Sequence, residues 1–289
     1  MRSNSDKSSK DGDLNRSEEQ NKECNTGRGN KLYIAGIGPG SQAHMSSRAV
    51  EVIKNAETIA GYSTYVDLIK DMIDGKKLIS TAMKKEVDRV KAAVDAALAG
   101  ENCVLVSSGD PGIYAMAGLA LEICKERGID ITRSEADAVG ANTLFVEVVP
   151  GIPALASCSA LLGAPLTHDF AVISLSDLLT PWEVIEKRIE GASMADFVMV
   201  IFNPKSKKRD WQLNKAQEIA LKYRDGSTPV GIVKSAMRDE QEINITTLGE
   251  LHKADVDMLT TVVIGNSNTM EYKDFLITPR GYSGKYDIK

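Results

Sequence analysis

The side chain with the clearest chemical potential is Asp110, in the segment S-S-G-D-P-G-I-Y at residues 107–114. This segment follows an apolar run at 103–106 and precedes a predicted helix at 113–127. A carboxylate at such a place caps the helix or accepts hydrogen bonds from a hydroxyl or amine of a ligand. Capping is the simpler interpretation of the residue in isolation, and the ligand-binding role stays open beside it.

Two other segments rich in glycine and proline also follow apolar runs, G-I-G-P-G at 36–40 and P-G-I-P at 150–153. The first differs from a dinucleotide-binding loop, because Ser41 stands where a third glycine is needed and Pro39 has no N–H to donate. No Gly-Lys-Ser/Thr follows it, as a Walker phosphate-binding loop requires. A rigid turn is the favoured interpretation of 36–40 taken alone.

Two further groups are candidates for chemistry. His168 and Asp169 are the only adjacent histidine and carboxylate in the chain. Neighbouring side chains rarely face each other, and no nucleophile accompanies this pair, which disfavours a hydrolase triad. The basic run N-P-K-S-K-K-R at 203–209 contains cations suited to carboxylates, and Arg209 offers a bidentate fork. The alternative for this run is a solvated connection to the next helix.

Strands and helices alternate around the three Gly/Pro segments. The apolar runs at 32–37 and 103–106 are predicted strands, and 46–60 and 86–99 are predicted helices. This alternation is typical of a parallel sheet, whose ligands bind outside the carboxyl ends of the strands. Because all three segments follow strands, we expect them to line one cleft.

The sequence predicts two α/β domains with the active site in the cleft between them. Residues 1–30 contain few apolar side chains and are predicted to be disordered. An N-terminal domain at 31–142 with a mostly parallel sheet precedes a C-terminal domain at 143–289 with a mixed sheet. The boundary rests on the polar, patternless segment 130–143, so a strand at 144–149 is assigned to the second domain.

The composition disfavours several classes of protein. A formal net charge of −5 and an isoelectric point near 5.4 disfavour a nucleic-acid-binding protein. No apolar run is long enough to span a membrane, and residues 1–30 lack the core of a signal peptide, which predicts a cytoplasmic protein. The histidines lack metal-ligand spacing, and the scattered cysteines predict buried thiols and no bound metal: Cys24, Cys103, Cys124 and Cys158.

The three Gly/Pro segments, in this order, closely resemble the motifs of the tetrapyrrole (corrin/porphyrin) methylase family. The third continues as A-L-A-S-C-S-A-L-L-G-A-P-L-T-H-D, and the resemblance extends from residue 31 to about residue 282. Three later motifs resemble the members that methylate carbon 17 of the macrocycle: S-L-S-D-L-L-T-P-W, F-N-P-K-S-K-K-R and I-G-N-S-N-T.

The resemblance implies S-adenosylmethionine bound between two α/β domains, held mostly by backbone groups. It also implies a homodimer. The cofactor contacts that it places on this chain lie in four loops: Ser108, Gly109, Asp110, Ile113, Pro153, Ala154, Asn203 and Ala236.

The resemblance also implies a tetrapyrrole substrate, either a precorrin or a cobalt-precorrin. The substrate is expected to lie along the turn at 36–40, and its carboxylates are expected to meet basic residues nearby. The substrate-binding residues are then Gly38, Pro39, Gly40, Lys205, Arg209 and Arg280.

The implied reaction is methylation of carbon 17 of precorrin-3B or cobalt-factor III, coupled to contraction of the ring. Methyl transfer from a sulfonium to an electron-rich carbon is an in-line displacement that needs no protein nucleophile, so orientation supplies most of the rate. Some relatives that methylate uroporphyrinogen have aspartate where this chain has Ser41. His168 and Asp169 therefore become the candidates for acid/base catalysis.

Three alternatives remain beside this function. The first is a methylase acting on another ring carbon, because the motifs around the cofactor are shared. The second is the related group of ribosomal-RNA ribose methyltransferases, which the acidic isoelectric point disfavours. The third is a non-catalytic protein that binds a corrinoid or a nucleotide.

Overall fold

The first sheet, in the N-terminal part of the chain, is fully parallel. A computed structural model describes residues 30–82, 84–206 and 209–288, so the disorder predicted for the N-terminal tail lies outside the described residues, except at Asn30. The sheet has the order β3-β2-β4-β1-β6-β5. Its strands are β1 Lys31–Gly36, β2 Thr58–Tyr62, β3 Lys77–Thr81, β4 Asn102–Ser107, β5 Asp130–Thr132 and β6 Thr143–Val149.

The place of β6 corrects the predicted domain boundary. This strand pairs with β1 from Phe145 opposite Lys31 to Val149 opposite Ala35, so it belongs to the first sheet and not to the second domain. The polar segment 130–143 contains the short edge strand β5, which pairs with β6. Its polar composition reflects a half-exposed sheet edge, and the sheet continues to Val149 before the chain crosses to the second domain.

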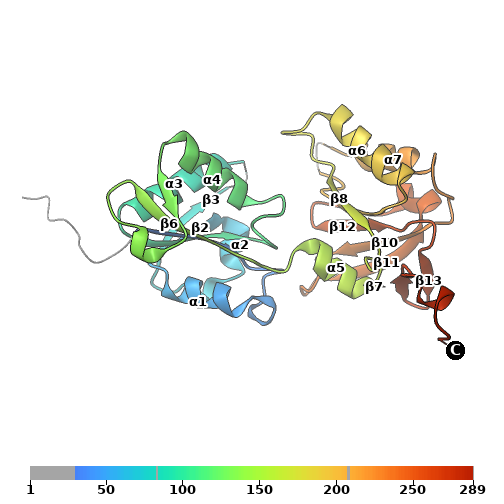
Figure 1. The fold of residues 1–289 in the computed structure, drawn as a ribbon, viewed down its shortest axis with the longest axis horizontal. Coiled ribbons are helices and arrows are strands. Elements are labelled where there is room, and N and C mark those ends of the chain that lie inside the picture. The colour runs from blue at the N-terminus through green and yellow to red at the C-terminus, as the bar shows by residue number, and fades with distance from the viewer. Residues whose placement is uncertain (1–29, 83, 207–208, 289) are drawn as a thin grey trace, which may run out of the picture.

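Helices cover both faces of this sheet, as a parallel sheet requires (Figure 1). One buried cluster joins α3 and α4 to one face, and another joins α1 and α2 to the opposite face. Ser46 caps α1 by accepting a hydrogen bond from the Ala49 N–H at 3.1 Å. The helices are α1 Ser47–Asn55, α2 Ser63–Asp67, α3 Glu86–Leu98 and α4 Met116–Glu126.

The second sheet is mixed, as predicted, with the order β11-β10-β12-β9-β8. Strands β8 and β9 are parallel, and the other neighbours are antiparallel. A small third sheet joins β7, β13 and β14. The strands are β7 Gly163–Ala164, β8 Phe170–Ser174, β9 Val198–Phe202, β10 Pro229–Lys234, β11 Glu242–Thr247, β12 Thr260–Ile264, β13 Met270–Tyr272 and β14 Phe275–Ile277.

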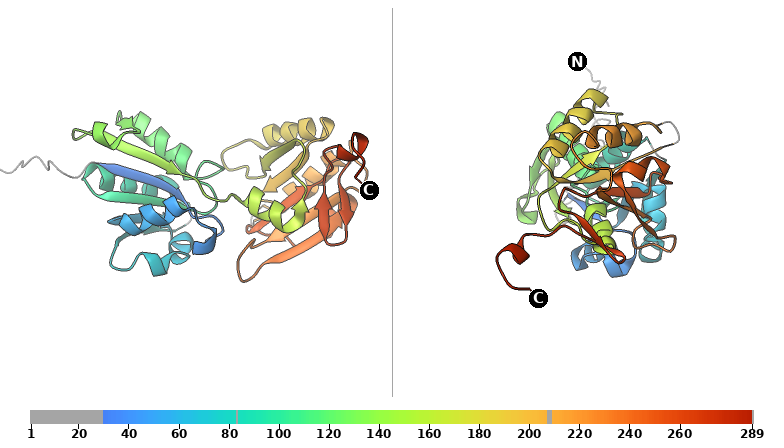
Figure 2. Two further views of the ribbon diagram at one scale, coloured as in Figure 1. Left: turned by 60° about the horizontal axis from the view of Figure 1, so that its bottom comes forward. Right: turned by 90° about the vertical axis from the view of Figure 1, so that its right-hand side faces the viewer.

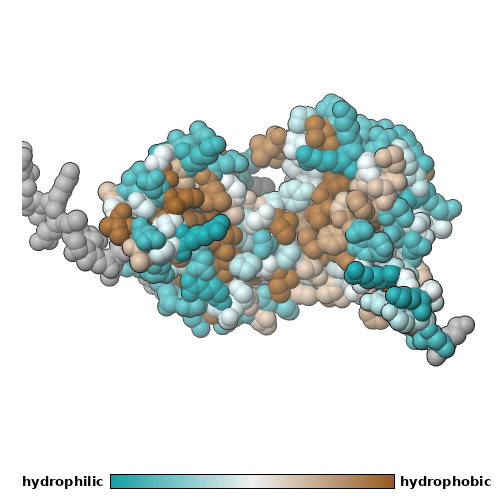
Figure 3. All heavy atoms as spheres, in the orientation of Figure 1, coloured by the Kyte–Doolittle hydropathy of each residue, from teal (hydrophilic) through white to brown (hydrophobic). Residues whose placement is uncertain are grey.

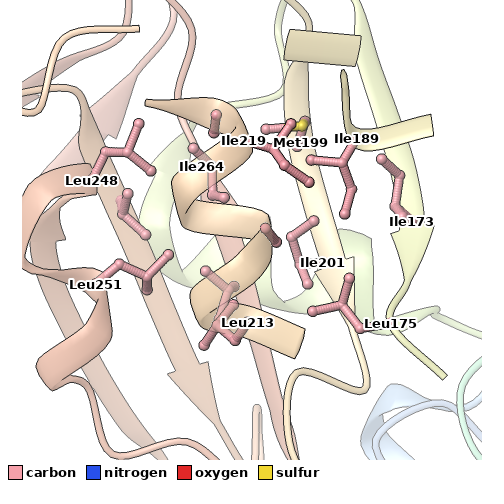
Figure 4. Close-up of a cluster of buried hydrophobic side chains, with 14 of the residues drawn as sticks. Ile173, Leu175, Ile189, Met199, Ile201, Leu213, Ile219, Leu248, Leu251 and Ile264 are labelled. Carbon is pink, nitrogen blue, oxygen red and sulfur yellow. The ribbon is translucent and has the colours of Figure 1, made fainter. Parts of the chain in front are cut away.

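Helices also cover the two faces of the second sheet. Helices α6 Trp182–Met194 and α7 Gln212–Ala220 pack over one face around a large buried cluster (Figure 4). Helix α5 Ala154–Leu162 packs over the other face, where Leu162 lies against Gly231 of β10. Short 3-10 helices lie in the connections between these elements and near the C-terminus: Gln42–His44, Lys70–Met72, Glu135–Asp137, Leu248–Lys253 and Tyr282–Gly284.

The two domains lie end to end, with the chain crossing once between β6 and α5 (Figure 2). The space-filling view shows a hollowed waist where they meet (Figure 3). Within the described ranges, no helix is long and apolar enough to cross a membrane. The architecture confirms two α/β domains, the first with a parallel and the second with a mixed sheet.

Candidate active site

The three Gly/Pro segments meet at one end of the first sheet. They follow β1, β4 and β6, which are neighbouring parallel strands, so their carboxyl ends lie side by side. Gly38 and Gly109 exchange two backbone hydrogen bonds, one from Gly38 N at 3.1 Å and one from Gly109 N at 2.9 Å. The convergence expected from the order of strands and loops is therefore present.

Backbone contacts at this meeting point leave no room for side chains. A Cβ on Gly151 would lie 2.1 Å from the carbonyl oxygen of Gly109, and a Cβ on Gly36 would lie 2.5 Å from the same oxygen. Gly109 itself has a φ of +68°, a conformation that favours glycine. Gly36 and Gly151 are thus required by the close approach of three loops, and Gly109 by its φ angle, which explains the positions of these glycines in the sequence.

The carboxylate of Asp110 joins two of these loops. Its Oδ1 accepts the Gly112 N–H at 2.8 Å, and its Oδ2 accepts the Gly151 N–H at 3.1 Å. Helix α4 begins at Met116, and its N-cap residue, Ala115, makes no side-chain capping bond. The capping interpretation of Asp110 is therefore wrong: the side chain holds the loops together at the edge of the cavity.

The C-terminal domain contributes the opposite wall from loops that follow its strands. Asn203 directly follows β9, and its Nδ2 donates to the Ser174 Oγ at 2.9 Å. Ser235 and Ala236 follow β10. Asn203 and Ser235 have left-handed φ angles of 53° and 48°, a strain often found at functional sites. On the N-terminal side of the cavity, Tyr114 has a φ angle of 51°.

Between the walls lies a cavity of about 360 Å³. This volume is in the range of small-molecule sites. Tyr114 bridges the two domains beside it, since its hydroxyl donates to the Val172 carbonyl at 3.0 Å and its ring lies 5.7 Å from that of Phe202. Every residue expected to contact the cofactor lines this cavity: Ser108, Gly109, Asp110, Ile113, Pro153, Ala154, Asn203 and Ala236.

The expected substrate-binding residues divide into two groups. Gly38 and Pro39 line the cavity, whereas Gly40 lies against Leu68 and does not. Lys205 and Arg280 also lie off the lining, Arg280 on the exposed stretch after β14. The structure therefore brings only the middle of the 36–40 turn to the cavity.

Arg209 lies behind the cavity wall. Its side chain is buried, its Nη2 is 3.7 Å from the Met258 Sδ, and Met258 is the residue that faces the cavity. Among the described residues, its Nε and Nη1 have no hydrogen-bond partner. Residues 207 and 208 of the same basic run lie outside the described residues.

His168 and Asp169 lie at the wrong end of the second sheet for acid/base catalysis at this cavity. They precede β8, which runs parallel to β9, and the carboxyl end of β9 reaches the cavity at Phe202. Both side chains are substantially exposed, at 49% and 77%. The Asp169 N–H donates to the His168 Nδ1 at 2.8 Å, a local contact that needs no ligand.

Two arginines on the cavity wall carry no signal in the motifs. Arg238 follows β10, and its Nε donates to the Pro39 carbonyl at 2.7 Å while its Nη2 donates to the Ser108 Oγ at 3.3 Å. Arg89 of α3 is only 4% exposed and also lines the cavity. The helical spacing of the sequence could have predicted that Arg89 is buried, because Arg89 occupies the same helix face as the buried Ala93 and Ala97.

Two further titratable groups of the cavity, Cys158 and Tyr65, are not activated as nucleophiles. Burial raises the pKa of the Cys158 thiol, so it stays protonated at neutral pH. Burial likewise raises the pKa of Tyr65. Within the part of the chain that the structure describes, no group of three or more His, Cys, Asp or Glu residues is arranged to hold a metal ion. The site offers binding and orientation.

Comparison with known proteins identifies the family. The model of the Tetrapyrrole (Corrin/Porphyrin) Methylases matches residues 31–252. A cobalt-factor III methyltransferase of Priestia megaterium is 50% identical over 258 residues, 89% of this chain and 46% of that protein, so the chain spans about half of its length. A probable cobalt-factor III C(17)-methyltransferase of Salmonella typhimurium is 45% identical over 252 residues, 87% of this chain and 99% of that protein.

A solved structure agrees with this assignment. The crystal structure of the methyltransferase CobJ superposes with a TM-score of 0.76 at 33% identity, covering 86% of this chain and 99% of that one. The family model covers most of the chain, including all three loops at the cavity. The chain therefore belongs to the tetrapyrrole (corrin/porphyrin) methylase family.

Proposed function

We propose that the protein is an S-adenosylmethionine-dependent C-methyltransferase of cobalamin biosynthesis, which methylates carbon 17 of cobalt-factor III or precorrin-3B with contraction of the ring. The observation that carries this proposal is the single cavity lined by all residues expected to contact the cofactor. Strong similarity to the Salmonella relative over nearly its whole length supports the choice of reaction.

The cavity fits S-adenosylmethionine in size and in the kind of groups it presents. Glycine-rich backbone at 108–110 and 150–153 lets a ligand approach the main chain closely, and Asn203 supplies an amide on the opposite wall. When bound, S-adenosylmethionine supplies a methyl group on a positively charged sulfur. The walls from two domains then restrict its position relative to the ring carbon of the substrate.

The protein's contribution to this reaction is orientation. The attacking carbon is itself electron-rich, so no side chain has to act as a nucleophile, in agreement with the protonated thiol of Cys158. Holding two reactants in line is worth effective molarities of roughly 10⁵–10⁸ M. Gly38 and Pro39 form the edge along which the macrocycle is placed.

We place the protein in the cytoplasm as a homodimer. The described cysteines are free and buried, which fits a reducing compartment. Exposed apolar side chains of α4, β5 and β6 line a hollow at the edge of the first sheet, and such a surface fits a contact between subunits: Leu121, Ile131 and Val148. Sedimentation equilibrium checks the dimer, and a single species of monomer mass would contradict it.

The direct test is methyl transfer to defined tetrapyrroles. Purified protein is incubated with methyl-labelled S-adenosylmethionine and either cobalt-factor III or precorrin-3B, and the product is examined by mass spectrometry and NMR. We expect a gain of one methyl group at carbon 17, abolished by excess S-adenosylhomocysteine. A methyl group on another ring carbon, or cofactor binding without transfer to either substrate, would overturn the proposal.

A further inference from the structure

We infer that Arg89 and Arg238 form a subsite in the cavity for one carboxylate of the macrocycle. This inference rests on the proposed function, because it assigns a place to one acidic side chain of that substrate. The two residues come from different domains, Arg89 from α3 and Arg238 from the loop after β10, and both line the cavity.

Arg89 is a buried cation that forms no ion pair with any of the described residues. Its Nε donates to the Thr81 Oγ1 at 3.2 Å, its guanidinium lies 5.9 Å from the centre of the Tyr62 ring, and its Nη2 has no hydrogen-bond partner among the described residues. Across the same part of the chain, no carboxylate lies within ion-pair distance of it. Buried guanidinium groups are normally paired, because an unpaired buried charge is costly.

Arg238 also bonds only to neutral groups. Its side chain reaches from the second domain to the first, where it donates to the Pro39 carbonyl and the Ser108 hydroxyl. These bonds fix the guanidinium at the cavity edge and leave its charge uncompensated within the described ranges. A ligand that approaches the 36–40 turn therefore meets a positioned cation.

The charges of both arginines act on one phenol, that of Tyr65. Both guanidinium charges act on Tyr65, where they lower the pKa of a hydroxyl that burial raises more strongly. The Tyr62 and Tyr65 rings pack edge to face, with their centres 5.2 Å apart, and both line the cavity. Guanidinium groups only donate hydrogen bonds, and a tyrosine hydroxyl can also donate one. Such a set of groups suits an anion with several acceptor oxygens, and a carboxylate has that chemistry.

The nearby carboxylates act on this corner through their charge, but among the described residues they do not bond to either arginine. Glu86 lines the cavity, but its Oε1 accepts the Lys84 N–H at 3.1 Å and it forms no ion pair with Arg89 in the described structure. Asp110 is held by two backbone N–H groups. Both guanidinium groups therefore remain available to an anion that enters the cavity.

A carboxylate can come from the macrocycle or from the methionine part of the cofactor, and the experiment separates them. The variants are Arg89→Gln, Arg238→Gln and the double variant, with Arg188→Gln as a matched control on the exposed surface of α6. For each, the KM and kcat with cobalt-factor III are measured together with the Kd of S-adenosylhomocysteine by calorimetry.

We expect each single variant to raise the KM for cobalt-factor III by about ten- to hundredfold, the loss of a charge-assisted hydrogen bond. The kcat and the Kd of S-adenosylhomocysteine should change less than about threefold. The double variant should lose less than the product of the two single effects, because both side chains serve one carboxylate. Arg89→Lys, which keeps the charge, should recover part of the affinity.

Two results would overturn the subsite. One is an unchanged KM in both single variants, and the other is a loss of S-adenosylhomocysteine affinity in place of tetrapyrrole affinity. If Arg89→Gln does not fold, Arg89→Lys and Arg238→Gln carry the test. Binding of cobalt-factor III is also followed by absorption titration. If the wild-type protein binds this tetrapyrrole but transfers no methyl group, the proposed function is refuted, and the titration of the arginine variants still tests the subsite.

Discussion

The two walls of the cavity are built by different means. The N-terminal wall consists of loops after neighbouring parallel strands, and its close backbone contacts exist only because glycine stands at Gly36 and Gly151, while Gly109 has a φ angle that favours glycine. The C-terminal wall comes from a mixed sheet, and its tight turns use Asn203 and Ser235 in left-handed conformations. The first wall therefore depends on the absence of side chains at close backbone contacts. The second wall depends on residues whose backbone is held at strained φ angles.

This difference explains why the first wall is easier to predict from the sequence, as a set of Gly/Pro motifs. A close contact between two main chains tolerates one residue type, whereas a strained turn accepts several types at a cost of about 1–3 kcal/mol. Substitutions should accordingly damage the first wall more than the second. The following predictions test that order.

The largest effect is expected at Gly151. Gly151→Ala places a Cβ 2.1 Å from the Gly109 carbonyl oxygen, so the loops must separate, and we expect a loss of about 3 kcal/mol in the free energy of unfolding. Urea denaturation measures it. The matched control is Gly118→Ala within α4, where a Cβ meets nothing within 4 Å. This substitution should raise the free energy of unfolding by about 0.5–1 kcal/mol. Equal stabilities for the two variants would refute the backbone-contact explanation.

The second effect concerns the link between the loops. Asp110→Ala leaves the Gly112 and Gly151 N–H groups without their acceptor, and we expect a loss of about 2 kcal/mol in stability together with weaker binding of S-adenosylhomocysteine. Thermal unfolding and calorimetry on the same sample measure both. Asp110→Asn keeps one acceptor oxygen and should lose less. A variant of wild-type stability would show that the carboxylate does not join the loops.

The third effect probes the second wall. Asn203→Ala removes the hydrogen bond to Ser174 and puts a less tolerant residue at a φ of 53°, so we expect a loss of about 1–2 kcal/mol in the free energy of unfolding, smaller than at Gly151. Asn203→Gly relieves the φ and isolates the hydrogen bond. If Asn203→Ala costs more than Gly151→Ala, the two walls do not differ as described.

The smallest effect is expected at the far end of the second sheet. His168→Ala and Asp169→Asn should change kcat with cobalt-factor III by less than about twofold, because both residues precede β8, away from the cavity. Steady-state methyl transfer at neutral pH is the measurement. A loss of tenfold or more in kcat, with unchanged stability, would restore these residues as candidates for acid/base catalysis.

The sequence allowed the loops and their meeting point to be predicted, because apolar strands followed by Gly and Pro have a physical meaning in a parallel sheet. It did not reveal that β6 belongs to the first sheet, since strand pairing depends on long-range contacts such as Phe145 opposite Lys31. His168 and Asp169 attracted attention as chain neighbours, but the direction of β8 carries them away from the cavity. Arg89 and Arg238 lie outside every motif, and only the fold brings them to one place.

A crystal structure of the protein with S-adenosylhomocysteine and cobalt-factor III tests the central claim most directly. We predict that the nucleoside product lies between the 108–110 loop and Asn203, with the macrocycle along Gly38 and Pro39 and one of its carboxylates beside Arg89. Density for S-adenosylhomocysteine anywhere other than the cavity between the domains would contradict the account.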